Sequence, residues 1–355
     1  HDIRPAPGHA GPGGTLLATS GPAIAMATSD GAVWIGHMRR PDADEPFKLP
    51  ARRALADGHF DLPEVPVDSE TGYREIDYRE DGDVGFLRFD FYNGAMSVDQ
   101  CRRLLDAYDK ARARPTRVIV LQGGDDFWSN GIHLNLIEAA GNPAEESWLN
   151  INAMNDLAEA IIRTESHLTV AAMRGNSGAG GVFLARACDH VWLHGAVVLN
   201  PHYKDMGNLY GSEFWTYLLP RHAGAENAKR ITQARLPMGA PEATALGLAD
   251  EILCRDRQGF DTQVRTGARA LAQAPDFAAT LAAKAARRRA DEADKPLSEY
   301  RDAELKRMRR NFFGFDTSYH VARYNFVYKV NKSRTPVTLA RHRDKTCEPR
   351  LREAS

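Results

Sequence analysis

"RGNSGAGGVFLARACDHV", residues 174–191, gathers small residues where a strand is predicted to turn into a helix. The run from Ser177 to Gly181 contains only serine, alanine and glycine, so it has no ionisable side chain. A glycine-rich turn at the start of a helix leaves backbone N–H groups unpaired and directs them, with the positive end of the helix dipole, at one point. The stretch therefore predicts a place where backbone amides stabilise negative charge.

Three interpretations of this turn compete at first. A dinucleotide-binding turn has the pattern G-x-G-x-x-G, and here Gly178 and Gly180 fit but position 183 is Phe. A phosphate-binding P-loop is excluded because the Gly-Lys-Ser/Thr sequence is missing. The third interpretation is close packing of a helix on a strand, which also favours small residues.

A second glycine-containing segment favours a binding site at this turn over simple packing of a helix on a strand. The stretch "GGDDFWSNGIHLNLI", residues 123–137, follows the apolar run "RVIVLQG", residues 117–123, and contains Gly131. Each of the two loops is expected at the carboxyl end of an apolar strand, so each can present one N–H group to the same oxygen atom. Such a pair of donors is an oxyanion hole.

Composition narrows the partners that the chain can bind. The 355 residues include 46 basic and 47 acidic side chains, with a formal net charge of −1. This balance gives no general attraction to nucleic acid or to an anionic membrane. No apolar run is long enough to span a membrane, and the first residues do not have the pattern of a secretion signal. We therefore expect no nucleic acid and no membrane among the partners.

The cysteines indicate the compartment of the protein, and the first residue bears on whether the sequence is a fragment. Cys101, Cys188, Cys254 and Cys347 are far apart in the sequence, which favours a reducing compartment, and we expect a cytoplasmic protein. His1 is not a translation start, so we expect the sequence to be a piece of a longer protein or a processed form.

The pattern along the chain predicts an α/β protein with a small β subdomain before it. Residues 1–60 contain short alternating runs around Asp30-Gly31, which favours a hairpin, and residues 61–72 are interpreted as a linker. Residues 73–255 alternate strands and helices, an order that implies parallel strands with crossover helices. Its first two strands are expected to flank Asp81-Gly82, and Ser97 and Gln100 stand at the spacing of a helix capping box. Residues 256–332 are predicted to be helices that pack on this core, and residues 333–355 a basic tail.

The segments "FWSNGIHL" and "GNSGAGGVFLARACD" together resemble the two signature segments of the crotonase (enoyl-CoA hydratase/isomerase) superfamily. The resemblance implies a crotonase-like ββα spiral with a helical C-terminal region, and coenzyme A as the carrier of the substrate. It assigns the two oxyanion donors to the backbone N–H groups of Ile132 and Gly180. The residues that it places near the substrate or CoA are Gly131, Ser129, Gly181, Asn176 and Asn200.

The chain departs from the pattern of the hydratases in this superfamily. Those enzymes carry one glutamate in the helix after the glycine turn and another in a Q-P-E segment about twenty residues later. Here the first position is Phe183, and "NPHY" replaces Q-P-E and puts His202 in the second position. Ordinary hydration of an enoyl-CoA is therefore not expected.

A narrower resemblance extends over nearly the whole chain. The stretches "VVLNPHYKDMGNLYGSEFWTYLLPR", residues 197–221, and "RRNFFGFDTSYHVARYNFVYK", residues 309–329, resemble a family of hydrogenase maturation factors. In that family a formyltransferase-like unit, which binds formyltetrahydrofolate, precedes a crotonase unit. The resemblance implies that residues 1–60 end the formyltransferase-like part, and that tetrahydrofolate binds only in the preceding part, which this sequence lacks.

The same resemblance implies a reaction and its residues. It predicts decarbonylation of formyl-CoA to carbon monoxide and CoA, with carbon monoxide supplied to the iron of nickel-iron hydrogenase. The catalytic side chains are predicted to be Tyr203 and Glu213, with His202 beside them. Glu213 is expected to act as base or relay and Tyr203 as donor or positioning hydroxyl. Expected partners are the acyl-CoA substrate, the missing formyltransferase-like part and hydrogenase maturation proteins.

Several alternatives stay open at this point. Another crotonase-type activity, such as acyl-CoA hydrolysis or isomerisation, or a non-catalytic CoA-binding module would use the same two loops. The histidines at 190 and 194 lack a third ligand at suitable spacing, so no metal is expected. Four cations either contact CoA phosphates or form a solvated helix face. They are Arg301, Lys306, Arg309 and Arg310.

Overall fold

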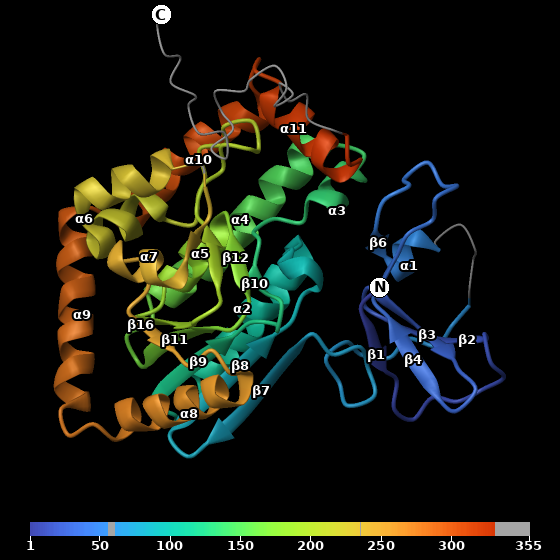
Figure 1. The fold of residues 1–355 in the computed structure, drawn as a ribbon, viewed down its shortest axis with the longest axis horizontal. Helices are drawn as coiled ribbons and strands as arrows, with labels where there is room; N and C mark the ends of the chain where they lie inside the picture. Colours follow the sequence, from blue (N-terminus) through green and yellow to red (C-terminus); the bar gives the residue numbers. More distant parts are fainter. Residues whose placement is uncertain (56–60, 235, 331–355) are drawn as a thin grey trace, which may run out of the picture.

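A computed structural model describes residues 1–55, 61–234 and 236–330. A small β subdomain at the N-terminal end lies beside a larger α/β core, and helices near the C-terminal end run along the outside of that core (Figure 1). The predicted basic tail, residues 333–355, lies outside the described residues.

The β subdomain is a four-stranded antiparallel sheet in the order β1-β4-β3-β2. The predicted hairpin is confirmed, because Asp30-Gly31 lies in the turn between β3 and β4 and the pairing Ala27↔Ala32 closes that hairpin. A two-stranded pair, β5 with β6, and the short helix α1 complete the subdomain. The elements are β1 (Ile3–Pro5), β2 (Leu16–Ser20), β3 (Ala23–Ala27), β4 (Ala32–Ile35), β5 (His37–Met38), β6 (Leu49–Pro50) and α1 (Ala51–Ala54).

The segment 61–72, interpreted from the sequence as a linker, packs against this subdomain. Glu64 forms a parallel bridge with Thr19 of β2. Val65 and Val67 pack against the apolar cluster around the buried Trp34. The segment therefore covers one side of the small sheet on its way to the core.

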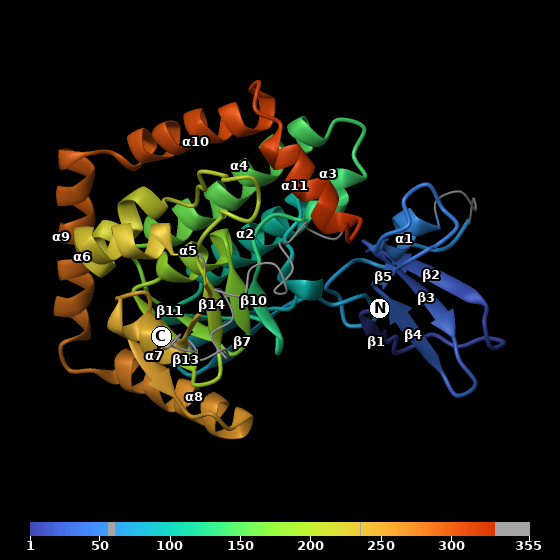
Figure 2. The same cartoon turned by 45° about the horizontal axis from the view of Figure 1, so that its top comes forward.

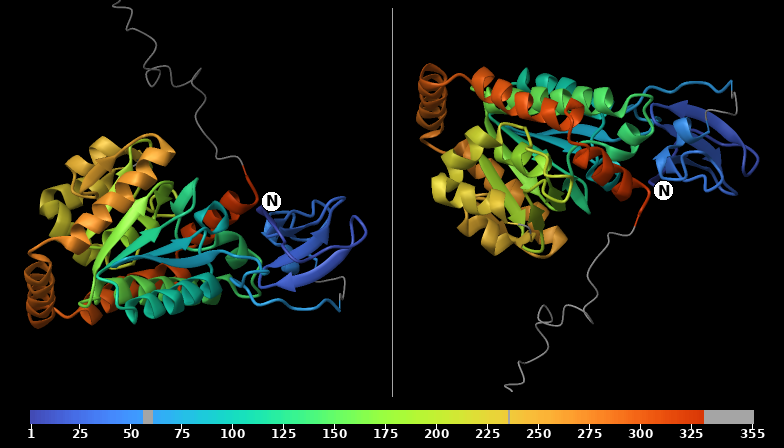
Figure 3. Two further views of the ribbon diagram at one scale, coloured as in Figure 1. Left: turned by 90° about the horizontal axis from the view of Figure 1, so that it is seen from below. Right: turned by 90° about the horizontal axis from the view of Figure 1, so that it is seen from above.

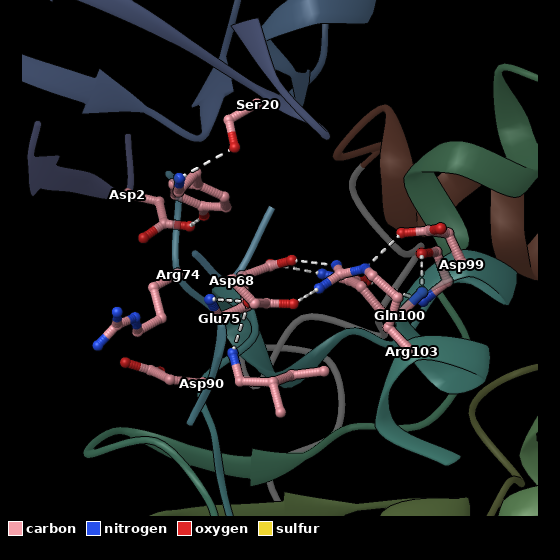
Figure 4. A network of polar contacts seen from close by, with 12 residues as sticks. Asp2, Ser20, Asp68, Arg74, Glu75, Asp90, Asp99, Gln100 and Arg103 are labelled. Carbon is pink, nitrogen blue, oxygen red and sulfur yellow. Dashed lines mark hydrogen bonds and ion pairs between the residues drawn. The ribbon is translucent and has the colours of Figure 1, made fainter. Parts of the chain in front are cut away.

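Arg103 forms ion pairs that join the start of the core to the segment 61–72 (Figure 4). Arg103 of helix α2 (Val98–Arg112) pairs with Asp68 at 2.6 Å, with Asp99 at 2.8 Å and with the buried Glu75. Gln100 donates a second hydrogen bond to Glu75 at 2.8 Å. Because a buried carboxylate needs such partners, this network fixes the chain where it passes from the β subdomain to the core.

The main sheet of the core has six strands in the order β16-β13-β11-β9-β8-β7. All neighbours are parallel except β7 and β8, which form the hairpin predicted around Asp81-Gly82. The middle strands are apolar on both faces, as expected for a sheet covered on both sides. The strands are β7 (Ile76–Asp81), β8 (Val84–Phe89), β9 (Val118–Gln122), β11 (Leu168–Met173), β13 (His190–His194) and β16 (Glu251–Leu253).

A second sheet of short strands follows the first, in the order β10-β12-β14-β15. Each of β9, β11 and β13 is followed by a short strand of this second sheet and then by helix, so the chain repeats a β-β-α turn. The strands are β10 (Phe127–Ser129), β12 (Asn176–Gly178), β14 (Val198–Asn200) and β15 (Met238–Gly239). This repetition is the spiral that the sequence predicts.

Helices cover both faces of the main sheet. Ile119 and Leu121 of β9 face the cluster that includes α2 and α4, whereas Val118 and Val120 face α8. Figure 3 shows these layers from two sides. Helix α2 begins with the predicted capping box, in which Ser97 and Gln100 bond reciprocally.

Of the last two helices, α11 lies on the side of the core that faces the β subdomain. Helix α10 packs along α4, and α11 lies beside α3 (Figure 2). The helices after α2 are α3 (Leu134–Glu138), α4 (Pro143–Ile162), α5 (Gly180–Arg186), α6 (Trp215–Gln233), α7 (Ala240–Ala245), α8 (Arg257–Gln273), α9 (Phe277–Asp294), α10 (Leu297–Phe313) and α11 (Ser318–Val327). Within residues 1–55, 61–234 and 236–330, none of the helices has the length and apolar character needed to cross a membrane.

Candidate active site

The two predicted donor loops lie side by side. Strands β10 and β12 pair in parallel, with Phe127 opposite Asn176 and Ser129 opposite Ser177. The Ser177 hydroxyl also donates to the carbonyl oxygen of Ser129 at 2.9 Å. Because the strands run in the same direction, their carboxyl ends meet and the loops that follow them face each other.

The backbone of these loops presents two free amides. Gly131 has a φ of +78°, a left-handed conformation that glycine adopts without strain, and a Cβ built there would lie 3.5 Å from the Gly180 nitrogen. Gly180 is the first residue of α5, so its N–H has no partner within the helix. Neither this N–H nor that of Ile132 donates to an acceptor among the described residues. The two amides are therefore available to a bound oxygen.

A buried acid and a tyrosine face the same point. The Tyr203 hydroxyl donates to Glu213 Oε2 at 2.9 Å, and the Glu213 side chain is buried. The carboxylate packs so closely on Gly180 that a Cβ at that position would overlap it. Only the resemblance predicted a catalytic role for these two residues, because no local sequence pattern singles them out. The structure places them together against one predicted oxyanion donor.

The turn that carries Glu213 has an unusual backbone. Glu213 and Phe214 both have a φ of +59°, a left-handed conformation that costs about 1–2 kcal/mol per non-glycine residue. Asn155 of α4 holds the turn, because its Oδ1 accepts from the Ser212 hydroxyl at 2.7 Å and from the Glu213 N–H at 2.8 Å. Sequence reasoning missed Asn155, since a single asparagine in a long helix gives no signal.

Burial changes the proton affinity of the pair. Desolvation raises the pKa of Glu213 to about 8; the Tyr203 hydroxyl lowers it and the neighbouring Glu304 carboxylate raises it. Burial and the Glu213 carboxylate together raise the pKa of Tyr203 well above its usual range. Tyr203 therefore stays protonated at neutral pH, whereas Glu213 can both take up and release a proton.

A cavity of about 1340 Å³ opens in front of these groups. Its lining includes both donor residues together with Gly131, Asn200 and the Tyr203–Glu213 pair. Other parts of the wall come from the β subdomain, from the end of α11 and from the residues that follow it. They include His37, Arg39, Phe47, Lys48, Phe326, Tyr328 and Lys329. The site thus lies between the crotonase-like core and the small β subdomain.

His202 also lines this cavity. It is buried, its Nδ1 accepts weakly from the Lys204 N–H at 3.4 Å, and its Nε2 has no partner among the described residues. The imidazole therefore has one nitrogen free for a substrate or a water molecule.

Three residues predicted to contact the substrate instead support the loops. Ser129, Gly181 and Asn176 are not among the described residues that line the cavity. The Ser129 hydroxyl accepts from the Gly131 N–H at 3.1 Å, and the Gly181 carbonyl accepts from Trp128 Nε1 at 3.0 Å. Asn176 Oδ1 accepts from the Val198 N–H at 2.9 Å. Their polar groups are thus used to hold the donor loops in place.

The cations of α10 do not line the cavity either. Arg301 pairs with Asp156 at 2.6 Å and with Glu159 at 3.0 Å, both on α4. Arg309 lies over the rings of Trp148 and Phe313. The cations in the cavity wall come from other segments, and the sequence analysis missed them. They are Arg39, Lys48 and Lys329.

No metal centre is found in the part of the chain that the structure describes. Within that part, no group of three or more histidine, cysteine or acidic side chains is arranged to hold a metal ion. Of the two histidines on β13, His194 places its Nε2 2.5 Å from the Arg255 carbonyl oxygen.

The geometry has a counterpart in a known family. The profile of the enoyl-CoA hydratase/isomerase family matches residues 91–327, which include both donor loops and the Tyr203–Glu213 pair. The chain belongs to the enoyl-CoA hydratase/isomerase family. An enoyl-CoA hydratase from Bacillus halodurans shares this fold, with a TM-score of 0.61, 19% sequence identity, and coverage of 71% of this chain and 99% of that one. The crotonase fold predicted from the sequence is confirmed.

The chain is also similar over nearly its whole length to two longer proteins. It is 57% identical over 343 residues to the hydrogenase maturation factor HoxX of Bradyrhizobium diazoefficiens, covering 97% of this chain and 59% of HoxX. The structure of HypX from Aquifex aeolicus in complex with tetrahydrofolic acid matches with a TM-score of 0.91 and 44% identity, covering 98% of this chain and 62% of HypX. The chain thus spans about three fifths of the length of these relatives. The predicted similarity to hydrogenase maturation factors is confirmed.

Proposed function

We propose that this chain converts formyl-CoA into carbon monoxide and CoA. The observation that carries the proposal is the placement of the Tyr203–Glu213 pair against Gly180, in a site without the two hydratase glutamates. The similarity to HoxX and HypX supports a role in hydrogenase maturation. Because formyl-CoA has no carbon next to its carbonyl group, the enolate chemistry typical of the family is not possible with this substrate.

The reaction rearranges one proton and two electron pairs. The ionised Glu213 takes the proton from the formyl carbon, and the electrons of the C–H bond become the carbon lone pair of carbon monoxide. The C–S bond breaks, and its electron pair leaves on the thiolate of CoA. Glu213 then returns the proton to sulfur, so atoms and charge balance without an oxidant or a reductant.

The two backbone amides act on the formyl oxygen. The N–H groups of Ile132 and Gly180 would bind this oxygen and stabilise the negative charge that forms on it as the C–H bond weakens. The Tyr203 hydroxyl, which stays protonated, would orient the Glu213 carboxylate toward the same carbon. A pKa of about 8 suits Glu213 to both proton transfers near neutral pH.

The cavity wall provides positive charge for the CoA phosphates. Lys48 and Lys329 come from opposite ends of the chain and both line the cavity, as does Arg39. The Lys48 ammonium donates to the Tyr92 hydroxyl at 2.8 Å and has further donors free for a phosphate. We assign these three cations to the CoA phosphates, and Gly131 and Asn200 to the acyl end.

The activity of the longer protein extends this proposal. We propose that a preceding formyltransferase-like part transfers the formyl group from formyltetrahydrofolate to CoA, consistent with the tetrahydrofolic acid bound to HypX. Carbon monoxide would then become a ligand of the iron in nickel-iron hydrogenase, with hydrogenase maturation proteins as partners. The free cysteines Cys101, Cys188 and Cys254 fit our expectation of a cytoplasmic protein.

Hydrolysis is the second candidate, and His202 is the observation that favours it. Its free Nε2 in the cavity wall could activate a water molecule, which would release formate and CoA. A single assay separates the candidates, in which the protein is incubated with formyl-CoA while carbon monoxide, formate and free thiol are measured. Equal amounts of carbon monoxide and thiol support decarbonylation. Formate with thiol indicates hydrolysis, and CoA binding without either product indicates a non-catalytic module.

A further inference from the structure

A second buried carboxylate holds the turn that carries Glu213. Glu304 of α10 is completely buried, and its Oε2 accepts from the Phe214 N–H at 3.0 Å. Its Oε1 accepts from the Thr216 N–H at 2.8 Å and from the Thr216 hydroxyl at 2.6 Å. All three donors belong to the end of the left-handed turn or to the start of α6.

This carboxylate is placed in an environment that opposes its charge. No cation forms an ion pair with Glu304 among residues 1–55, 61–234 and 236–330. Burial raises its pKa to about 7, although the hydrogen bonds from Thr216 and Phe214 lower it. Burying a carboxylate without a cation costs free energy, and hydrogen bonds to its oxygens offset part of this cost.

The hydrogen bonds of Glu304 hold a strained backbone turn. Two consecutive non-glycine residues, Glu213 and Phe214, are left-handed, and such strain persists only where the surroundings hold it. Asn155 holds the turn from α4 at the Glu213 N–H, and Glu304 holds it from α10 at the next N–H. Together they bond two successive amides of the strained turn from different helices.

We propose that Glu304 is a positioning residue, which fixes the left-handed turn at Glu213 and Phe214 so that the Glu213 carboxylate points at Gly180. The effect on catalysis rests on the proposed decarbonylation. Glu304 is not among the described residues that line the cavity, so it acts through Glu213 and not on the substrate. An ordinary helix cap needs one acceptor, whereas this position needs both oxygens of a carboxylate.

The variant Glu304→Gln tests this role. A glutamine can keep one oxygen toward Thr216, but its amide group then opposes the Phe214 N–H with another donor. We expect kcat for formyl-CoA to fall about 10- to 100-fold while KM and the affinity for CoA stay within about twofold, because a displaced carboxylate impairs only the chemical step. A crystal structure of the variant should lack the Tyr203–Glu213 hydrogen bond. Glu299→Gln, an exposed position on the same helix, is the matched control and should behave like the wild type.

The results separate this proposal from the proposed function. If the wild type releases no carbon monoxide, the proposed function fails, and the variant's structure alone decides the positioning role. An unchanged kcat in an active enzyme, a change confined to KM, or an intact Tyr203–Glu213 bond in the variant would overturn the role of Glu304. If Glu304→Gln does not fold, Thr216→Val removes one donor to the same carboxylate, and we expect a several-fold loss of kcat at constant KM. An unchanged kcat in Thr216→Val would then overturn the proposal.

Discussion

Replacing Glu213 by glutamine should stabilise the protein while it abolishes carbon monoxide release. The folded-state pKa of about 8 lies above the ordinary value of 4.5, so ionisation of Glu213 opposes folding. This cost begins as the pH rises above 4.5 and levels off above 8. From these two pKa values, we expect the variant's free energy of unfolding, relative to that of the wild type, to increase by about 3 kcal/mol as the pH rises from about 5.5 to about 8.5.

Urea denaturation of both proteins across this pH range measures the difference. The amide oxygen of the introduced glutamine would still accept the hydrogen bond from Tyr203, so the comparison isolates the charge. Glu299→Gln is again the control for the substitution itself, because that side chain is exposed. A pH-independent difference for Glu213→Gln would refute a raised pKa, and the assignment of Glu213 as the base would lose its physical support.

Three further substitutions test other parts of the account. Tyr203→Phe removes the hydrogen bond that lowers the pKa of Glu213, so carbon monoxide release should fall and the acidic limb of the kcat/KM profile should move to higher pH; an unmoved limb would contradict the pairing. Gly180→Ala places a Cβ on the Glu213 carboxylate and should lower kcat by about 10²- to 10³-fold, whereas Gly141→Ala, in open space, should have little effect. Arg103→Met leaves the buried Glu75 without its cation and should lower the free energy of unfolding by about 3–5 kcal/mol, measured in urea. The exposed Arg79→Met should cost less than about 1 kcal/mol, and equal losses would contradict a structural role for the Arg103 network.

Local sequence signals predicted the elements of the fold well. The Asp-Gly hairpins, the capping box at Ser97 and the apolar strand at 117–123 each depend on a few neighbouring residues, and the structure has all of them. The glycine segments likewise predicted loops that lie side by side, since parallel strands bring their carboxyl ends together.

The walls of the site depend on contacts between distant segments, which local patterns do not reveal. Lys48 and Lys329 reach the same cavity from opposite ends of the chain. The holding groups Asn155 and Glu304 lie in helices whose sequences contain many other polar residues. The resemblance placed Ser129 near the substrate, whereas in the structure its hydroxyl accepts a hydrogen bond from the Gly131 N–H.

The central claim is that the Ile132 and Gly180 amides bind the carbonyl oxygen of a CoA thioester. Isotope-edited infrared spectroscopy of bound acetyl-CoA, labelled with ¹³C at the carbonyl and lacking a formyl hydrogen, measures this contact directly. Two N–H donors withdraw electron density from the C=O bond, so the account predicts a carbonyl stretch at lower frequency on the protein than in water. A stretch at or above its frequency in water would contradict it.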